Sequence, residues 1–83
     1  MTLMSEVRPQ ALVGDLFRQQ RKHAGLKQAE VAARLGVPQS FVSKYESGER
    51  KLDLVEAHDV CKALGIKLTD FSALFEQKLE QGV

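Results

Sequence analysis

Residues 28–48 read QAEVAARLGVPQSFVSKYESG, and this stretch decides the fold. It predicts two short helices joined by a tight turn, because Gly-Val-Pro at 36–38 supplies a helix stop, an inward apolar residue and a helix start. When each residue after Pro38 is rotated by about 100°, the second helix divides into two faces. One face is polar and carries Gln39, Ser40, Ser43, Lys44 and Ser47. The opposite face suits packing and carries Phe41, Val42, Tyr45 and Glu46.

The polar face of this second helix suits insertion into the major groove of DNA, where amide, hydroxyl and ammonium groups meet base edges. An ordinary amphipathic helix with a solvated face explains the same pattern equally well. The helix alone does not separate these two interpretations, so the rest of the sequence has to decide between them.

The composition is that of a small globular domain. A chain of 83 residues has the length of one domain with a modest core, and we expect no separate catalytic or ligand-sensing domain. No apolar run approaches the roughly 18 residues that cross a membrane, and no signal-peptide pattern opens the sequence. A single cysteine, Cys61, excludes an intramolecular disulfide. These features predict a cytoplasmic protein without a membrane anchor.

The net charge of +1 conceals an uneven distribution along the chain. Residues 18–51 carry eight Lys or Arg against three Glu, a net charge of +5. Residues 52–83 carry three Lys against six Asp or Glu, a net charge of −3. The positive charge therefore coincides with the suspected recognition helix, where it would attract DNA phosphates.

Helical spacing of apolar residues without strand-like alternation predicts an all-α fold. We expect a flexible tail over residues 1–9 and a single domain over residues 10–83. Asp53, with Glu56 three residues later, predicts a capping box, and Thr69 is expected to cap the C-terminal helix of residues 69–80. The expected helices cover about residues 10–23, 28–35, 38–47, 54–64 and 70–80.

Catalytic and metal chemistry find no support in the sequence. The two histidines, His23 and His58, have no companions at metal-ligand spacing. Cys61 falls on the inner face of a predicted helix, with neither a base nor a glycine-rich oxyanion loop nearby, which favours a core position. We therefore expect no catalytic residue, no metal site and no cofactor.

The run GLKQAEVA at residues 25–32, followed by Leu-Gly-Val at 35–37, resembles the phage-repressor and Cro-like (XRE-type) helix-turn-helix family. The resemblance continues through Gln-Ser at 39–40, Val-Ser at 42–43, Tyr-Glu at 45–46, Gly48 and Ala-Leu-Gly-Ile at 63–66. It implies a five-helix, lambda-repressor-like DNA-binding domain. In such a domain residues 28–47 form the helix-turn-helix, and its second helix enters the major groove.

The resemblance also implies roles for individual residues, position by position. Base reading would fall to Gln39, Ser40, Ser43 and Lys44, phosphate binding to Gln28, Lys27, Arg50 and Lys51, and a structural ion pair to Arg21 and Glu46. The pair would explain a carboxylate on a packing face, where an unpaired charge is costly. Contacts of the two serines with backbone or water, and of Arg21 with phosphate, stay open. Lys27 and Pro38 depart from the family, which usually has a Ser or Thr cap there.

The last predicted helix has an apolar stripe larger than one small core needs, and this stripe predicts a dimer contact through Phe71, Leu74, Phe75 and Leu79. The preceding helix of residues 54–64 is an additional candidate for this contact. A two-fold homodimer would hold two recognition helices about 34 Å apart on a palindromic operator.

The expected function is sequence-specific binding of double-stranded DNA to regulate transcription, as a repressor or an activator. One alternative is the DNA-binding antitoxin of a toxin–antitoxin pair, so that a toxin or RNA polymerase is a candidate partner. Another is a protein-interaction module that kept the fold without binding DNA.

Overall fold

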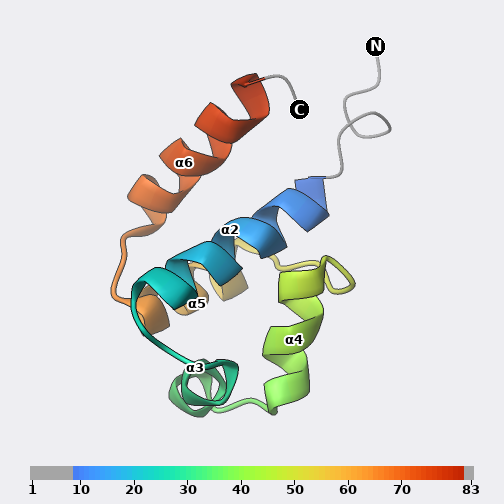
Figure 1. The fold of residues 1–83 in the computed structure, drawn as a ribbon, viewed down its shortest axis with the longest axis vertical. Helices are drawn as coiled ribbons and strands as arrows, with labels where there is room; N and C mark the ends of the chain where they lie inside the picture. Colours follow the sequence, from blue (N-terminus) through green and yellow to red (C-terminus); the bar gives the residue numbers. More distant parts are fainter. Residues whose placement is uncertain (1–8, 82–83) are drawn as a thin grey trace.

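The computed structural model describes residues 9–81, and every regular element within that range is a helix. The all-α prediction is therefore confirmed. Helix α2 crosses the middle of the molecule beside α5, while α3 and α4 lie at one end and α6 at the other (Figure 1). The helices are α2 (Pro9–His23), α3 (Gln28–Leu35), α4 (Gln39–Ser47), α5 (Leu54–Leu64) and α6 (Leu68–Glu80).

Most helix boundaries fall where the sequence predicts them. The bounds of α3 agree with the prediction, and α5 starts after Asp53 and ends before Gly65. Helix α2 begins at Pro9, one residue earlier than expected, so Pro9 does not belong to the tail predicted over residues 1–9. Residues 1–8 of that predicted tail lie outside the described residues. Pro38 is the N-cap of α4, with φ −66° and an extended ψ of 154°.

The start of α6 differs from the prediction. Lys67, not Thr69, occupies the N-cap position, and no side chain caps this helix. Thr69 lies inside the first turn, where its carbonyl accepts a hydrogen bond of 3.0 Å from the Ser72 hydroxyl. The prediction that Thr69 caps this helix is wrong, because half-buried Leu68 packs against the core and brings the helix start forward.

Acidic side chains accept backbone hydrogen bonds at the N-terminal ends of α3 and α5. The Asp53 carboxylate accepts a 2.7 Å hydrogen bond from the Glu56 amide, and the Glu56 carboxylate accepts a 3.0 Å bond from the Asp53 amide. This capping box was predicted and is confirmed. At α3, Lys27 supplies no side-chain cap, but the Glu30 carboxylate accepts a 2.8 Å bond from the Lys27 amide.

The turn between α3 and α4 depends on Gly36, whose φ of 71° is in the left-handed region. The amides of Gly36 and Val37 donate hydrogen bonds of 3.2 Å and 3.0 Å to the last turn of α3. Val37 is then half-buried against the core, which fixes the direction in which α4 leaves the turn.

Gly14 lets α2 approach α4 more closely than any other residue would allow. A Cβ atom built at this position would lie 2.2 Å from the Tyr45 carbonyl oxygen and 2.6 Å from that of Glu46. The backbone of α4 therefore rests directly on α2. Helical periodicity predicts that Gly14 lies within a helix but gives no sign of this contact.

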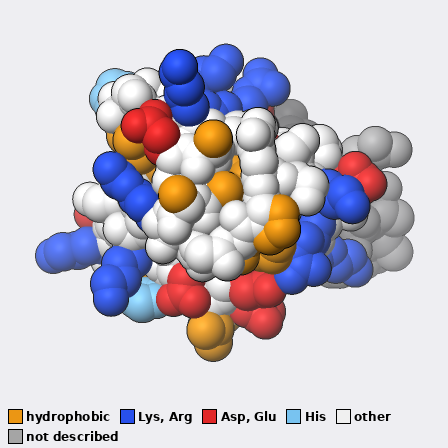
Figure 2. Space-filling model, turned by 90° about the horizontal axis from the view of Figure 1, so that it is seen from below, with side chains coloured by type: hydrophobic (Ala, Val, Ile, Leu, Met, Phe, Trp, Pro, Cys, Tyr) orange, Lys and Arg blue, Asp and Glu red, His pale blue; other side chains and the backbone are white. Residues whose placement is uncertain are grey.

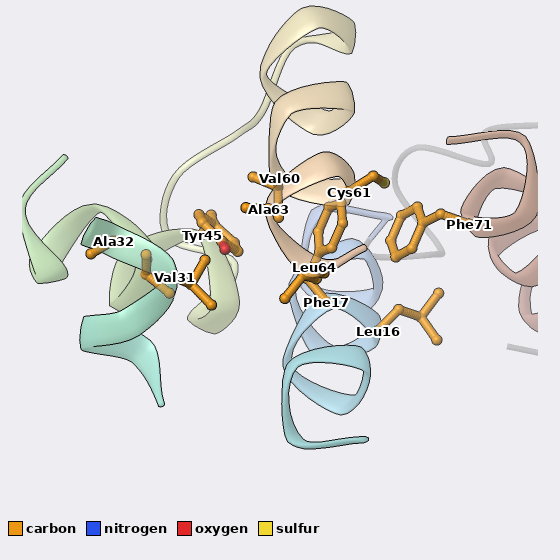
Figure 3. Close-up of a cluster of buried hydrophobic side chains, with 11 residues drawn as sticks. Leu16, Phe17, Val31, Ala32, Tyr45, Val60, Cys61, Ala63, Leu64 and Phe71 are labelled. Carbon is orange, nitrogen blue, oxygen red and sulfur yellow. The ribbon is translucent and has the colours of Figure 1, made fainter. Parts of the chain in front are cut away.

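The hydrophobic core is centred on Phe17, which is fully buried (Figure 3). Its ring stacks on Phe71 at 3.9 Å between centroids and meets Tyr45 edge-on at 5.8 Å. Cys61 is also fully buried, as predicted, and burial raises the pKa of its thiol to about 11.

Phe71 corrects the predicted dimer contact. Its side chain is only 4% exposed and points into the core of its own domain, so it is not available to a second copy. The other three residues of that stripe, Leu74, Phe75 and Leu79, are half-buried, and Phe75 packs against the core.

Candidate nucleic-acid interface

The polar strip of α4, defined here as Gln39, Ser40, Ser43 and Lys44, is exposed along its whole length. Neither α2 nor α3, on which α4 packs, covers any of the four residues. Figure 2 shows the end of the molecule that holds α3 and α4, with Lys and Arg side chains around uncharged atoms and acidic groups at several places on the rim, most of them at the bottom of the view. An exposed strip of this kind is accessible to a large partner.

The opposite face of α4 is fixed in the core. Val42 is fully buried, and Tyr45 and Glu46 are 2% and 7% exposed. Burial is also the main cause of a raised pKa for the Tyr45 hydroxyl, with the neighbouring Glu46 carboxylate acting in the same direction. The helix is therefore held on its apolar face, and its polar face is presented without freedom to rotate.

A buried ion pair joins α2 to α4. The Arg21 guanidinium donates through Nε to Glu46 Oε2 at 2.7 Å and through Nη2 to Oε1 at 3.1 Å, and its Nη1 donates to the Leu26 carbonyl at 2.9 Å. The hydrogen bond to Glu46 is the main reason that the pKa of Arg21 is raised further above its ordinary value. The two residues named from the resemblance thus lie in direct contact.

A chain of hydrogen bonds runs from this ion pair to the polar strip. The Gln28 amide nitrogen donates to Glu46 Oε1 at 3.0 Å, and the Gln39 amide nitrogen donates to Gln28 Oε1 at 3.3 Å. Gln28, expected at a phosphate, is half-buried and sits between a buried carboxylate and an exposed amide. Its contacts orient the Gln39 side chain.

The predicted phosphate-binding cations fall into two groups. Lys27 and Lys51 are exposed, and no salt bridge to either is found within residues 9–81. Arg50, in contrast, donates to the Glu56 carboxylate at 2.6 Å and lies 4.5 Å above the centre of the Phe41 ring. Neither of these contacts, with Glu56 or with Phe41, follows from the sequence pattern.

Arg34 is a second residue whose role sequence reasoning missed. Its guanidinium donates a 2.7 Å hydrogen bond to the Ala63 carbonyl in the last turn of α5. This bond fastens α3, the first helix of the motif, to the helix behind it. The position of Arg34 near the end of α3 does not predict this bond, because its acceptor lies 29 residues further along the chain.

Residues 9–81 hold no cluster of three or more His, Cys, Asp or Glu side chains arranged to bind a metal ion. None of the five helices has the length and apolar character required to span a bilayer.

Comparison with known proteins agrees with this geometry. The family model for a helix-turn-helix domain matches residues 17–71. An uncharacterised HTH-type transcriptional regulator from Sinorhizobium fredii is 38% identical over 55 residues, which cover 66% of this chain and 71% of the relative.

Two solved structures extend the comparison to the fold. An XRE-family-like protein from Pseudomonas syringae pv. tomato superposes with a TM-score of 0.78 and 44% identity over 90% of each chain. The restriction-modification controller protein C.Esp1396I, a tetramer in complex with its natural 35 base-pair operator, superposes with a TM-score of 0.81. At 18% identity over 89% of this chain and 97% of that one, the second match shows a shared fold alone.

Proposed function

Because the chain belongs to the XRE-type helix-turn-helix family of DNA-binding regulators, we propose that it binds a palindromic operator as a dimer and regulates transcription. The observation that carries the proposal is the division of α4. Its polar strip is wholly exposed, while Val42, Tyr45 and Glu46 on the opposite face are buried. A helix held in this way can enter the major groove without paying to order itself on binding.

Base reading is assigned to the polar strip of α4. The amide of Gln39 suits the paired donor and acceptor of adenine, and the Lys44 ammonium suits the acceptors of guanine. Ser40 and Ser43 carry short hydroxyls that reach either a base edge or the sugar–phosphate backbone. Since each good base contact discriminates by about 1–3 kcal/mol, a strip of this size suffices for a specific site.

Phosphate binding is assigned to the residues flanking the polar strip. Lys27 and Lys51 are exposed at the start of α3 and in the α4–α5 loop, respectively. The first amides of α3, beginning at Gln28, have no acceptor within their own helix and favour a phosphate oxygen. The contacts on both sides would set the register of α4 in the groove.

A second copy of the chain is proposed to dock on apolar surface at the start of α5. Leu54 and Val55 are 72% and 69% exposed, which is unusual for adjacent large apolar residues. A groove of about 290 Å³ lies beside Leu54, and its lining includes Val13 on α2 and Phe75 on α6. Two-fold pairing across this surface would bury Leu54 and Val55 and give the two copies of α4 a fixed spacing.

Selection of bound duplexes from a random pool tests the proposed function. Wild-type protein is expected to enrich a palindromic sequence, and Lys44→Ala is expected to enrich a sequence altered at the positions that Lys44 reads. Lys67→Ala is the matched control, because it removes an exposed lysine between α5 and α6 and is expected to leave the preference unchanged. If Lys44→Ala enriches the wild-type sequence, the base-reading role of Lys44 is wrong.

A protein-interaction module is the second candidate, and the exposure of Leu54 and Val55 is the observation that favours it. The two functions differ in their response to salt. DNA binding requires that affinity for duplex fragments fall steeply between about 50 and 200 mM salt, because phosphate contacts release counterions. A chain that shows no salt-dependent binding to any duplex would instead act through its apolar surface.

A further inference from the structure

The side chain of Arg50 lies between two helices. Its guanidinium carbon lies 4.5 Å above the centre of the Phe41 ring on α4, and its Nη2 atom donates to Glu56 Oε2 on α5 at 2.6 Å. The side chains of Arg50 and Glu56 are 41% and 31% exposed, so the pair is only partly covered by protein. One planar cation therefore contacts the first turn of α4 and the first turn of α5 together.

Further hydrogen bonds hold the Glu56 carboxylate and the backbone of Arg50. The second carboxylate oxygen of Glu56 accepts from the Asp53 amide at 3.0 Å, as part of the cap of α5. The Lys44 carbonyl accepts from the backbone amides of Glu49 and of Arg50 itself at 2.9 Å and 3.1 Å. The loop between α4 and α5 is thus tied to both helices that it connects.

We propose that Arg50 is a positioning residue: the Phe41–Arg50–Glu56 bridge fixes the orientation of α4 relative to the DNA. This inference rests on the proposed function. It reassigns Arg50, for which the family resemblance implied a phosphate contact. The guanidinium already has a carboxylate at 2.6 Å, so it adds little free positive charge for a phosphate.

The bridge requires arginine in particular. A guanidinium can stack its flat face on an aromatic ring while its edge donates to a carboxylate, whereas a lysine ammonium is a compact charge that cannot do both in the same way. Arg50→Lys therefore keeps the charge and loses the geometry. A phosphate contact shows the reverse sensitivity, because it depends mainly on charge.

Salt dependence of DNA affinity separates the two roles, measured on a duplex that the wild-type protein enriches from the random pool. A plot of log affinity against log salt concentration has a negative slope, and removing one phosphate contact makes this slope shallower by about 0.9. We expect this change for Lys51→Gln, which is the matched control, and no change of slope for Arg50→Gln. We expect Arg50→Lys to weaken binding by roughly three- to tenfold at unchanged slope.

A double-mutant cycle in DNA affinity distinguishes positioning from a purely structural contribution. Melting curves first establish that Phe41→Leu, Arg50→Lys and the double variant are folded at the assay temperature. If the bridge orients α4, the double variant binds DNA about as well as the weaker single variant. If the effects of the two substitutions on affinity add, or if folded Arg50→Lys binds as the wild type does, the positioning role is wrong.

The outcomes also separate this inference from the function on which it rests. A wild-type protein without salt-dependent binding to any duplex overturns the proposed function, and the positioning role with it. If the wild-type protein binds DNA and the salt dependence of Arg50→Gln is shallower by about one, the positioning role alone is wrong.

Discussion

Glu46 shows how much a single residue can contribute to both the fold and the candidate site. It lies on the packing face of α4, where a carboxylate without a partner would be strongly disfavoured. The Arg21 guanidinium neutralises it with two hydrogen bonds, and the Gln28 amide uses one of the same oxygens. The buried charge thus becomes the anchor from which Gln28 and Gln39 are oriented.

Glu46→Gln is expected to lower the free energy of unfolding by about 3 kcal/mol, because it leaves the Arg21 charge buried without its counter-ion. Urea denaturation of the two proteins measures this difference. Glu49→Gln is the matched control, since Glu49 is exposed, and is expected to change stability by less than about 0.5 kcal/mol. Equal effects of the two substitutions would contradict the structural role of the pair.

The buried thiol of Cys61 predicts a loss of stability at high pH. Burial raises its pKa from 9.0 to about 11, so the folded state holds the proton more tightly than the unfolded chain does. The contribution of this group to stability is complete below about pH 9 and is lost as the pH rises toward 11.

Cys61→Ala removes this titration and provides the comparison. The difference in unfolding free energy between the wild type and Cys61→Ala is expected to be constant from pH 7 to 8.5 and to decrease above about pH 9. Chemical denaturation across this pH range, under reducing conditions, measures it. The two proteins differ at residue 61 alone, so a constant difference up to pH 10.5 would contradict the assignment.

Residue roles were predictable where one short stretch contains the reason for them. The exposure of Gln39 and Lys44 and the burial of Val42 follow from helical periodicity alone. The contact of Arg50 with Phe41 and Glu56 does not, because it depends on how two separate helices are placed. Phe41 precedes Arg50 by nine residues and Glu56 follows it by six, and neither separation matches a helical contact spacing.

At the scale of helices, boundaries were predicted best where a backbone requirement admits few residue types. Gly36 ends α3 in the left-handed conformation, and Asp53 begins α5 with a side-chain cap. The prediction failed at α6, where a hydroxyl at Thr69 gave a plausible local signal. Packing of Leu68 against the core outweighed that signal and moved the helix start to an uncapped position.

The two caps can be compared by experiment. Asp53→Ala removes a side chain that accepts a 2.7 Å hydrogen bond at the start of α5, and is expected to cost about 1 kcal/mol of stability. Thr69→Ala removes no cap and replaces a poorer helix former within α6, so it is expected to be neutral or slightly stabilising. Thermal unfolding of both variants measures the effects. A larger loss for Thr69→Ala than for Asp53→Ala would contradict the capping assignments.

At the scale of the whole molecule, the fold separates surfaces with different proposed partners. The polar strip of α4 lies at the end formed by α3 and α4, and α6 lies at the opposite end (Figure 1). The exposed apolar pair Leu54 and Val55 lies at the start of α5, directly after the α4–α5 loop, and does not belong to α6. A dimer formed there would place its axis close to the recognition helices. The sequence prediction centred on the apolar stripe of α6, with α5 as an additional candidate, and Phe71 of that stripe is used by the core itself.

A double variant, Leu54→Gln with Val55→Gln, tests the dimer without changing the charge near DNA. It is expected to sediment as a monomer at a concentration where the wild type is a dimer. Its affinity for a full palindrome is expected to fall by on the order of 100-fold, because the linkage of two half-sites is lost. Its affinity for an isolated half-site is expected to stay unchanged, since the polar strip is untouched. Ala73→Gln, at an exposed position on α6, is the matched control and is expected to remain dimeric. If Ala73→Gln dissociates the dimer and the double variant does not, the dimer forms through α6; if the wild type is a monomer with and without DNA, two-fold recognition is wrong.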